Sequence, residues 1–268
     1  MKTLTTTLIA ILFCSVLIAQ PGELKKIEHN LFLGIDGMTI TDLFAFIDVD
    51  KDKFFNDKKV DGGSIYYIRE YNDFQKLSFS TTWFDYTLLV DIENEEILYS
   101  NVGVSGVKSG SEEGVFQQYH TSFKTYVEEH EVAYDVEIDL GNEDMSPLTN
   151  FVFGTGCGWD GVIPEKGLKM FDLIKKGDQE TLVTWTKSMN PSIQCYGVMG
   201  LRFMENSGQK IKLKKKDRKI LELVKSNKTV IDYCSNIALN STTPMNAVLN
   251  DFYLDTIWDL YKDSKYMK

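Results

Sequence analysis

Histidine is scarce in this sequence: only His29, His120 and His130 occur among the 268 residues. No two of them have the H-x-x-x-H or H-E-x-x-H spacing of helical zinc sites. His120 and His130 would lie ~15 Å apart along the axis of one helix, which is too far to share an ion. We therefore expect no metal or other cofactor, and we interpret both as surface histidines at the end of a charged helix.

Motifs of nucleophilic and phosphate-binding sites are also missing. No G-x-S-x-G nucleophile elbow occurs. The glycine-rich run at 154–158 lacks the lysine and the Ser/Thr of a phosphate-binding loop. A hydrolase or thiol enzyme would therefore need side chains that meet only in three dimensions. The candidates for such a site, near residues 154–161, are His120, His130, Asp144, Cys157, Asp160 and Glu165.

After residue 20, no segment is apolar enough to span a bilayer, which takes ~20 apolar residues. The N-terminus differs, because Lys2 precedes an apolar run over 8–19 that has the length of a signal-peptide core. Ala19 suits a cleavage site, so we predict that residues 1–20 are a signal peptide. Lipidation at Cys14 is the alternative, but Phe13 stands where such signals carry a small residue. We expect an exported protein, periplasmic or extracellular.

Positive charge is outnumbered: 29 Lys and Arg face 39 Asp and Glu, a net charge of −10. This balance argues against a surface for nucleic acid or an anionic membrane. The exception is the basic segment 210–219, which could dock an acidic partner or simply form a solvated connection between helices. Its lysines are Lys210, Lys212, Lys214, Lys215 and Lys216, followed by Arg218 and Lys219.

Cysteine is rare as well, and three remain once residues 1–20 are removed: Cys157, Cys195 and Cys234. In an oxidising compartment this count predicts one disulfide and one thiol. Three pairings are possible. We favour Cys157 with Cys234, because each lies in a short non-helical stretch beside a helix. Cys195 falls inside a predicted helix, where a free cysteine serves as a small hydrophobic residue.

Strand-like periodicity dominates residues 62–156. A helix that begins near Ser111 and continues beyond residue 123 interrupts this pattern, and a helical turn capped by Thr41 precedes it. The segments predicted as strands are 63–71, 75–82, 86–92, 96–104, 132–140 and 149–156. We therefore predict an α+β domain over 21–156, in which an antiparallel sheet packs on one long helix.

From 157 to 268 the period becomes helical, which predicts an all-helical second domain. Helix signals are clear at Gly177, which ends one helix, at Asp178, which caps the next, and at Asn190-Pro191, which opens a third. The predicted helices cover 164–176, 179–189, 192–206, 219–227 and 244–265.

Residues 178–205 resemble a HEAT-type αα repeat, in which a tight Asx-Pro turn joins two helices. The positions that match are Leu182, Asn190, Pro191, Ile193, Gly197, Gly200 and Leu201. Gln194 stands where the family usually has arginine, and one pair of helices is less than a solenoid needs. The resemblance implies a helical scaffold and no catalysis. The chain as a whole resembles exported bacterial proteins of mixed architecture.

Two polar stretches have a structural and a functional interpretation. The run 153–161, "FGTGCGWDG", joins the two predicted domains, and we prefer a structural corner, anchored by Trp159 and stapled by Cys157, to a reactive loop. Asp48, Asp50 and Asp52 alternate as in a calcium loop, but lysines stand where that loop needs glycine and glutamate. We therefore prefer a solvated acidic turn to a weak calcium site.

We interpret the protein as a non-catalytic interaction module that contacts an unknown protein or polymer, and its oligomeric state is not set by the sequence. The expected contacts are the basic segment and Trp159, Trp185 and Trp258. The alternatives are a hydrolase or thiol enzyme near 154–161, and an inhibitor or immunity-type protein whose acidity would suit a basic target.

Overall fold

In the computed structural model, the described residues are Ile35, 38–61, 63–70, 74–81, 84–104, 115–157, 160–234 and 241–267. They divide into two compact units, each with its own hydrophobic core. The sheet unit comprises the described residues up to 68 and those from 74 to 124. The helical unit comprises 69–70 and 125–267. The predicted α+β class is confirmed. The predicted signal peptide and the predicted helix start near Ser111 lie outside the described residues.

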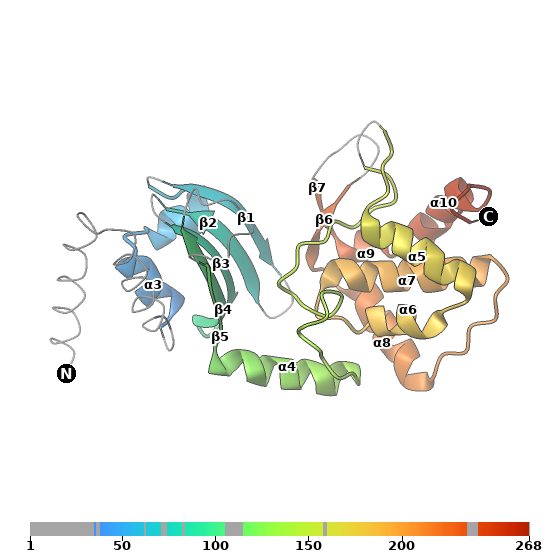
Figure 1. Cartoon of the computed structure of the whole chain (residues 1–268), viewed down its shortest axis with the longest axis horizontal. Coiled ribbons are helices and arrows are strands. Elements are labelled where there is room, and N and C mark those ends of the chain that lie inside the picture. The colour runs from blue at the N-terminus through green and yellow to red at the C-terminus, as the bar shows by residue number, and fades with distance from the viewer. Residues whose placement is uncertain are drawn as a thin grey trace. The chain divides into compact units, whose positions relative to one another are not determined.

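The sheet unit contains a five-stranded sheet in the order β1-β2-β3-β4-β5 (Figure 1). Its strands are β1 Ser64–Glu70, β2 Gln75–Ser80, β3 Phe84–Asp91, β4 Glu96–Val104 and β5 Val115–Tyr119. The pairs from β2 to β5 are antiparallel. The first four strands match the prediction. Residues 115–119 do not, because we assigned them to a helix and they pair with β4 instead.

Alternate residues of β2 and β3 form the core of the sheet unit, as a period of two requires. Phe79 of β2 stacks on its cross-strand partner Tyr86, with ring centroids 4.9 Å apart. Helix α3 Ile40–Phe46 and the π-helix η1 Lys53–Asp57 supply Phe44 and Phe54, whose rings lie 5.7 and 5.0 Å from that of Phe79. The cap of α3 is Thr39 in a capping box with Asp42, and not Thr41 as predicted.

Helix α4 Thr121–Tyr134 follows β5 and passes from the sheet unit into the helical unit. The predicted strand 132–140 is wrong, because its first residues complete α4 and the rest form turns and irregular backbone. Residues 149–156 form no strand either: Phe153 makes an isolated parallel bridge with Tyr233. The division of the chain therefore falls near residue 124 instead of 156, since 125–156 pack with the helices.

The helical unit is built around α7 Pro191–Asn206, which contacts α5, α6, α8, α9 and α10 (Figure 1). Nearly all of α7 is buried, because its sequence is apolar on every side. The surrounding helices are α5 Glu165–Lys176, α6 Gln179–Trp185, α8 Lys215–Ser226, α9 Met245–Val248 and α10 Asp251–Tyr261. The predicted last helix is two helices, and the strands β6 Val230–Tyr233 and β7 Ser241–Pro244 were not predicted.

The caps predicted in this unit are present. Gly177 ends α5 in the left-handed conformation, the Asp178 side chain accepts from the backbone of Thr181, and Asn190 caps α7 with Pro191 at its first turn. Gly197 lets α6 approach α7 closely, because a Cβ there would lie 2.7 Å from the backbone nitrogen of Thr186. The αα hairpin is thus formed, while its assignment to the HEAT type stays a prediction.

Candidate binding site

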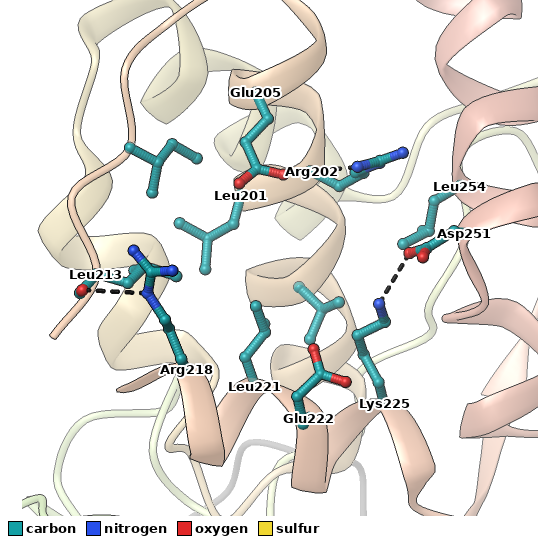
Figure 2. Close-up of a pocket in the computed structure, with 12 residues that line it drawn as sticks. Leu201, Arg202, Glu205, Leu213, Arg218, Leu221, Glu222, Lys225, Asp251 and Leu254 are labelled. Atoms are coloured by element: carbon teal, nitrogen blue, oxygen red, sulfur yellow. Dashed lines mark hydrogen bonds and ion pairs between the residues drawn. The ribbon is translucent and has the colours of Figure 1, made fainter. Parts of the chain in front are cut away.

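The helical unit contains a pocket of about 420 Å³ between α7, α8, the start of α10 and the connection that precedes α8 (Figure 2). Its volume falls in the range of small-molecule sites, ~300–1,000 Å³. Side chains from segments far apart in the sequence line it: Val198, Leu201, Arg202, Glu205, Ile211, Leu213, Arg218, Leu221, Glu222, Lys225, Asp251 and Leu254. Half of these are aliphatic and half are charged.

The floor of the pocket is aliphatic. Val198 and Leu201 of α7 and Leu254 of α10 are almost fully buried and also belong to the core of the unit. Leu221 of α8 is half-buried beside them. Because the core fixes these side chains, the floor has a defined shape before any ligand binds.

The extended connection 209–214 forms one wall. The Gln179 side chain holds this connection through two hydrogen bonds to the backbone of Lys212. Its Oε1 accepts from the Lys212 nitrogen at 2.8 Å, and its Nε2 donates to the Lys212 oxygen at 2.9 Å, as a neighbouring strand would. Exposure then alternates, with Ile211 and Leu213 half-buried in the pocket and the lysines at 210, 212 and 214 exposed.

Two cations of the rim are already neutralised within the protein. Arg202 binds Asp255 through two hydrogen bonds, of 2.9 Å from Nε and 2.8 Å from Nη2. Hydrogen bonds from Arg202 and Asn206 hold the pKa of the Asp255 carboxyl below its ordinary value. The hydrogen bond to Asp255 in turn raises the pKa of Arg202. Lys225 of α8 pairs with Asp251 of α10 at 2.8 Å. These two pairs join α10 to α7 and to α8.

Two charged residues of α8 that line the pocket, Arg218 and Glu222, have no ion-pair partner in the described ranges. Arg218 Nε donates a hydrogen bond to the backbone oxygen of Leu213 at 3.4 Å. Figure 2 shows the Arg218 side chain extending from α8 toward Leu213 of the connection. Glu205 on the α7 wall has only a long contact, 3.6 Å, to Arg202 Nη1.

The basic segment 210–219 is therefore partly a connection and partly the first turn of α8. Its lysines are exposed, as predicted, and Lys216 pairs with Asp135 at 2.7 Å. From the sequence, this segment was predicted only as a charged surface. The same segment also supplies two aliphatic residues and Arg218 to a pocket, which was not predicted.

The prediction that Trp185 contacts a partner at the surface is wrong. This side chain is 2% exposed in the core of the helical unit, where its Nε1 donates to Asp144 Oδ2 at 3.2 Å. Trp258 is half-buried, with its ring centroid 5.4 Å from that of Phe203. Trp159 lies outside the described residues. A tryptophan on a short amphipathic helix gives no signal of which side it faces until the neighbouring helices are placed.

Asp144 is a buried anion between two lysines. Its carboxylate lies 2.6 Å from Lys166 Nζ and 2.6 Å from Lys169 Nζ. Burial by itself raises the pKa of Asp144, but the hydrogen bonds from Lys166 and Lys169 outweigh it and the net shift is downward. Ser188 Oγ also donates to its backbone oxygen at 2.5 Å. This cluster fastens the irregular segment before residue 150 to α5 and α6.

The corner at 153–157 is held from several sides. The predicted disulfide joins Cys157 to Cys234, and Cys195 is free and buried. The Tyr196 hydroxyl accepts from the backbone nitrogen of Gly154 at 3.1 Å, and the Tyr261 hydroxyl donates to the backbone oxygen of Thr155. Burial raises the pKa of the Cys195 thiol well above its ordinary value. The described part of the corner thus has a structural role, as predicted.

The remaining candidates are not brought together by a shared hydrogen bond or ion pair that the structure describes. His120 is buried, contrary to prediction, and hydrogen-bonds Ser100 Oγ at 3.0 Å, because it lies between β5 and α4 instead of on a helix surface. His130 hydrogen-bonds the backbone oxygen of Lys187 at 2.9 Å. Asp160 and Glu165 are exposed. Cys157 is no free thiol. In the described ranges, no three His, Cys, Asp or Glu side chains are grouped to hold a metal ion.

The acidic run at 48–52 does not form a calcium loop, because it leads directly into η1. Asp50 Oδ1 accepts from the backbone nitrogen of Lys53 at 3.0 Å, and Lys53 Nζ pairs with Asp61 at 3.1 Å. Phe54, which follows, is fully buried in the core of the sheet unit. The packing of that phenylalanine fixes the backbone as a helical turn.

Neither a family model, nor a curated protein, nor a solved structure matches this chain. Within the described residues, no helix combines the length and apolarity that crossing a membrane requires.

Proposed function

We propose that the protein is an exported, non-catalytic binding module, and that its ligand occupies the pocket between α7, α8 and α10. One observation carries this proposal: the pocket combines an aliphatic floor with two charged side chains, Arg218 and Glu222, that form no ion pair with any residue in the described ranges. Small-molecule sites likewise combine apolar surface with polar groups that orient the ligand, although the charged share here, half of the lining residues, is larger than usual.

The rigidity of the pocket supports binding over a fortuitous surface hollow. Gln179 holds the wall at 209–214, and the Arg202–Asp255 and Lys225–Asp251 pairs join α10 to α7 and α8. A pocket whose walls are held in place loses little conformational entropy when it binds. A catalytic function has less support, since four of the side chains proposed for it, His120, His130, Asp144 and Cys157, are engaged by separate partners, and Asp160 and Glu165 are exposed.

Export is part of the proposal and is supported by the disulfide, because such bonds persist in oxidising compartments. The measurement is the mature N-terminus of the secreted or periplasmic protein, determined by mass spectrometry. Cleavage close to residue 20 agrees with the proposal, and a full-length cytoplasmic chain with three or more reduced cysteines contradicts it.

The binding test uses three probes that share a short aliphatic body: butyrate, butylammonium and the dipeptide Leu-Leu. Methyl-labelled protein is titrated with each, and the methyl resonances of Val198, Leu201 and Leu254 are followed. We expect at least one probe to shift all three signals, because these side chains form the floor. If none of the probes shifts them, the proposed function is wrong.

A matched pair of variants on α8 locates the site. Leu221→Trp places a large ring in the pocket, whereas Leu223→Trp adds the same ring at a half-exposed position that does not line it. Binding should be lost in the first variant and kept in the second. Far-ultraviolet circular dichroism confirms that both are folded. Unchanged binding in a folded Leu221→Trp protein would place the ligand elsewhere.

A further inference from the structure

The two unpaired charges of the pocket come from one helix face. Arg218 and Glu222 stand four residues apart on α8, a spacing at which opposite charges commonly pair with each other. They form no such pair here, while Arg218 Nε is directed to the backbone oxygen of Leu213. The two terminal nitrogens of the guanidinium therefore remain to donate, and both oxygens of Glu222 remain to accept. The pocket therefore offers one cation, Arg218, to a ligand's anionic group and one carboxylate, Glu222, to a ligand's cationic group.

The charge on the α7 wall, which lies across the pocket from α8, argues against a purely anionic ligand. Glu205 of α7 has only its long contact to Arg202, and Arg202 is already bound to Asp255 through two hydrogen bonds. An anion near Arg218 would thus face two carboxylates that no strong ion pair neutralises. A ligand that carries an ammonium as well as a carboxylate satisfies both signs.

The spacing of the two residues along α8 sets a scale for the length of the ligand. Four residues of helix rise ~6 Å. Two residues of extended peptide span up to ~7 Å between their ends, whereas a single amino acid is about half as long. The aliphatic floor of Val198, Leu201 and Leu254 lies beside these charges and suits apolar side chains.

We infer that the pocket binds a short free peptide of about two residues with apolar side chains. In this arrangement, Arg218 donates to the terminal carboxylate and Glu222 accepts from the terminal ammonium. The inference rests on the proposed function, because it names the ligand class of the same pocket. It requires no bond to be made or broken.

The test is calorimetric titration of the mature protein with Leu-Leu, N-acetyl-Leu-Leu, Leu-Leu-amide and the doubly capped dipeptide. Each cap removes one charge-assisted interaction, so we expect each to weaken binding about tenfold or more. Arg218→Gln should bind Leu-Leu and Leu-Leu-amide equally well, since the carboxylate then has no partner. Glu222→Gln should likewise bind Leu-Leu and N-acetyl-Leu-Leu equally well.

Lys219→Gln is the control for the arginine variant, because Lys219 is an exposed cation of the same helix that does not line the pocket. It should keep the full preference for free termini. If wild-type protein binds capped and free dipeptides equally, this inference is overturned and the binding function of the pocket stands. If no dipeptide, butyrate or butylammonium binds, both are overturned.

Discussion

Gly154 lies so close to Cys234 that a Cβ on Gly154 would stand 2.5 Å from the backbone oxygen of Cys234 and 2.6 Å from its sulfur. Phe153, one residue earlier, exchanges backbone hydrogen bonds with the same stretch: its nitrogen donates to Asp232 and its oxygen accepts from Cys234. The glycine is therefore required by contact with a neighbouring backbone, and it allows the chain to pass beside the disulfide.

Gly154→Ala should destabilise the helical unit by ~1–3 kcal/mol, the usual effect of an overpacked site, because backbone atoms cannot move aside as a side-chain end can. Urea unfolding with the disulfide intact measures this. Gly141→Ala is the control, since the only atom near its Cβ belongs to the Asp139 side chain, at 3.1 Å. Equal stability of the two variants would mean that the corner accommodates a methyl group.

Removing the disulfide with the double change Cys157→Ser and Cys234→Ser should cost ~2–5 kcal/mol, because the bond closes a loop between residues 77 apart. In the intact mature protein, thiol counting by mass spectrometry should find one thiol, Cys195. That thiol should react with alkylating reagents only on unfolding, since it is buried and its pKa is raised. Fast alkylation of Cys157 in the native protein would contradict the structure.

Asp144→Asn should destabilise the protein by ~3–5 kcal/mol at neutral pH, because it leaves Lys166, whose side chain is 12% exposed, without its buried partner. The pKa of Asp144 is lower in the folded protein than in the unfolded chain. Its stabilising effect is therefore complete above the unfolded value, ~3.9, and is lost as the pH falls below it. The difference between wild type and variant should shrink over that range.

Asp255→Asn is the matched control for this experiment. It also removes a carboxylate from an ion pair, but the Asp255 side chain is 45% exposed, so solvent screens the interaction and the loss should stay within ~1 kcal/mol. Urea unfolding of both variants from pH 7 to pH 3 gives the comparison. An Asp144 variant that loses no more stability than the Asp255 variant would show that the buried cluster contributes little.

The two glycines of α7 should respond differently to alanine. At Gly197 a new Cβ would meet backbone atoms of α6, the nitrogen of Thr186 at 2.7 Å and the oxygen of Leu182 at 2.8 Å. At Gly200 it would meet the end of the Leu182 side chain at 2.6 Å, which can rotate. We expect Gly197→Ala to cost ~1–3 kcal/mol. Gly200→Ala should stay within ~1 kcal/mol of wild type, because helix propensity favours alanine. Thermal unfolding ranks the two, and the reverse order would contradict the α6–α7 packing.

Signals that act over a few residues were predictable from the sequence. The strands β1 to β4 follow from alternation, and Gly177, Asp178 and Asn190 mark helix ends through hydrogen bonds to their own neighbours. Prediction failed where the same local pattern suits two structures. Residues 115–119 carry aromatic residues at helical spacing, yet they pair with β4, since the edge of a sheet was available to them.

The candidate site was mostly beyond prediction. An alternation of lysine with Ile211 and Leu213 was visible, and so was the spacing of Arg218 and Glu222 on one helix face. The contacts that build the other walls were not visible in the sequence. Arg202 binds Asp255, 53 residues away, and Gln179 binds the backbone of Lys212, 33 residues away. Nothing in either neighbourhood indicates such a partner.

By itself, the sequence determined the α+β class, most helix caps and the placing of Cys195 inside a helix, since local geometry and composition govern these. It allowed three disulfide pairings, and the tertiary structure selected the favoured one, Cys157 with Cys234. Only the tertiary structure decided that 125–156 pack with the helices, that Trp185 belongs to the core, and that the basic segment lines a pocket. The reason is physical: burial and ion pairing depend on which distant surfaces meet, and local sequence sets only which surfaces exist.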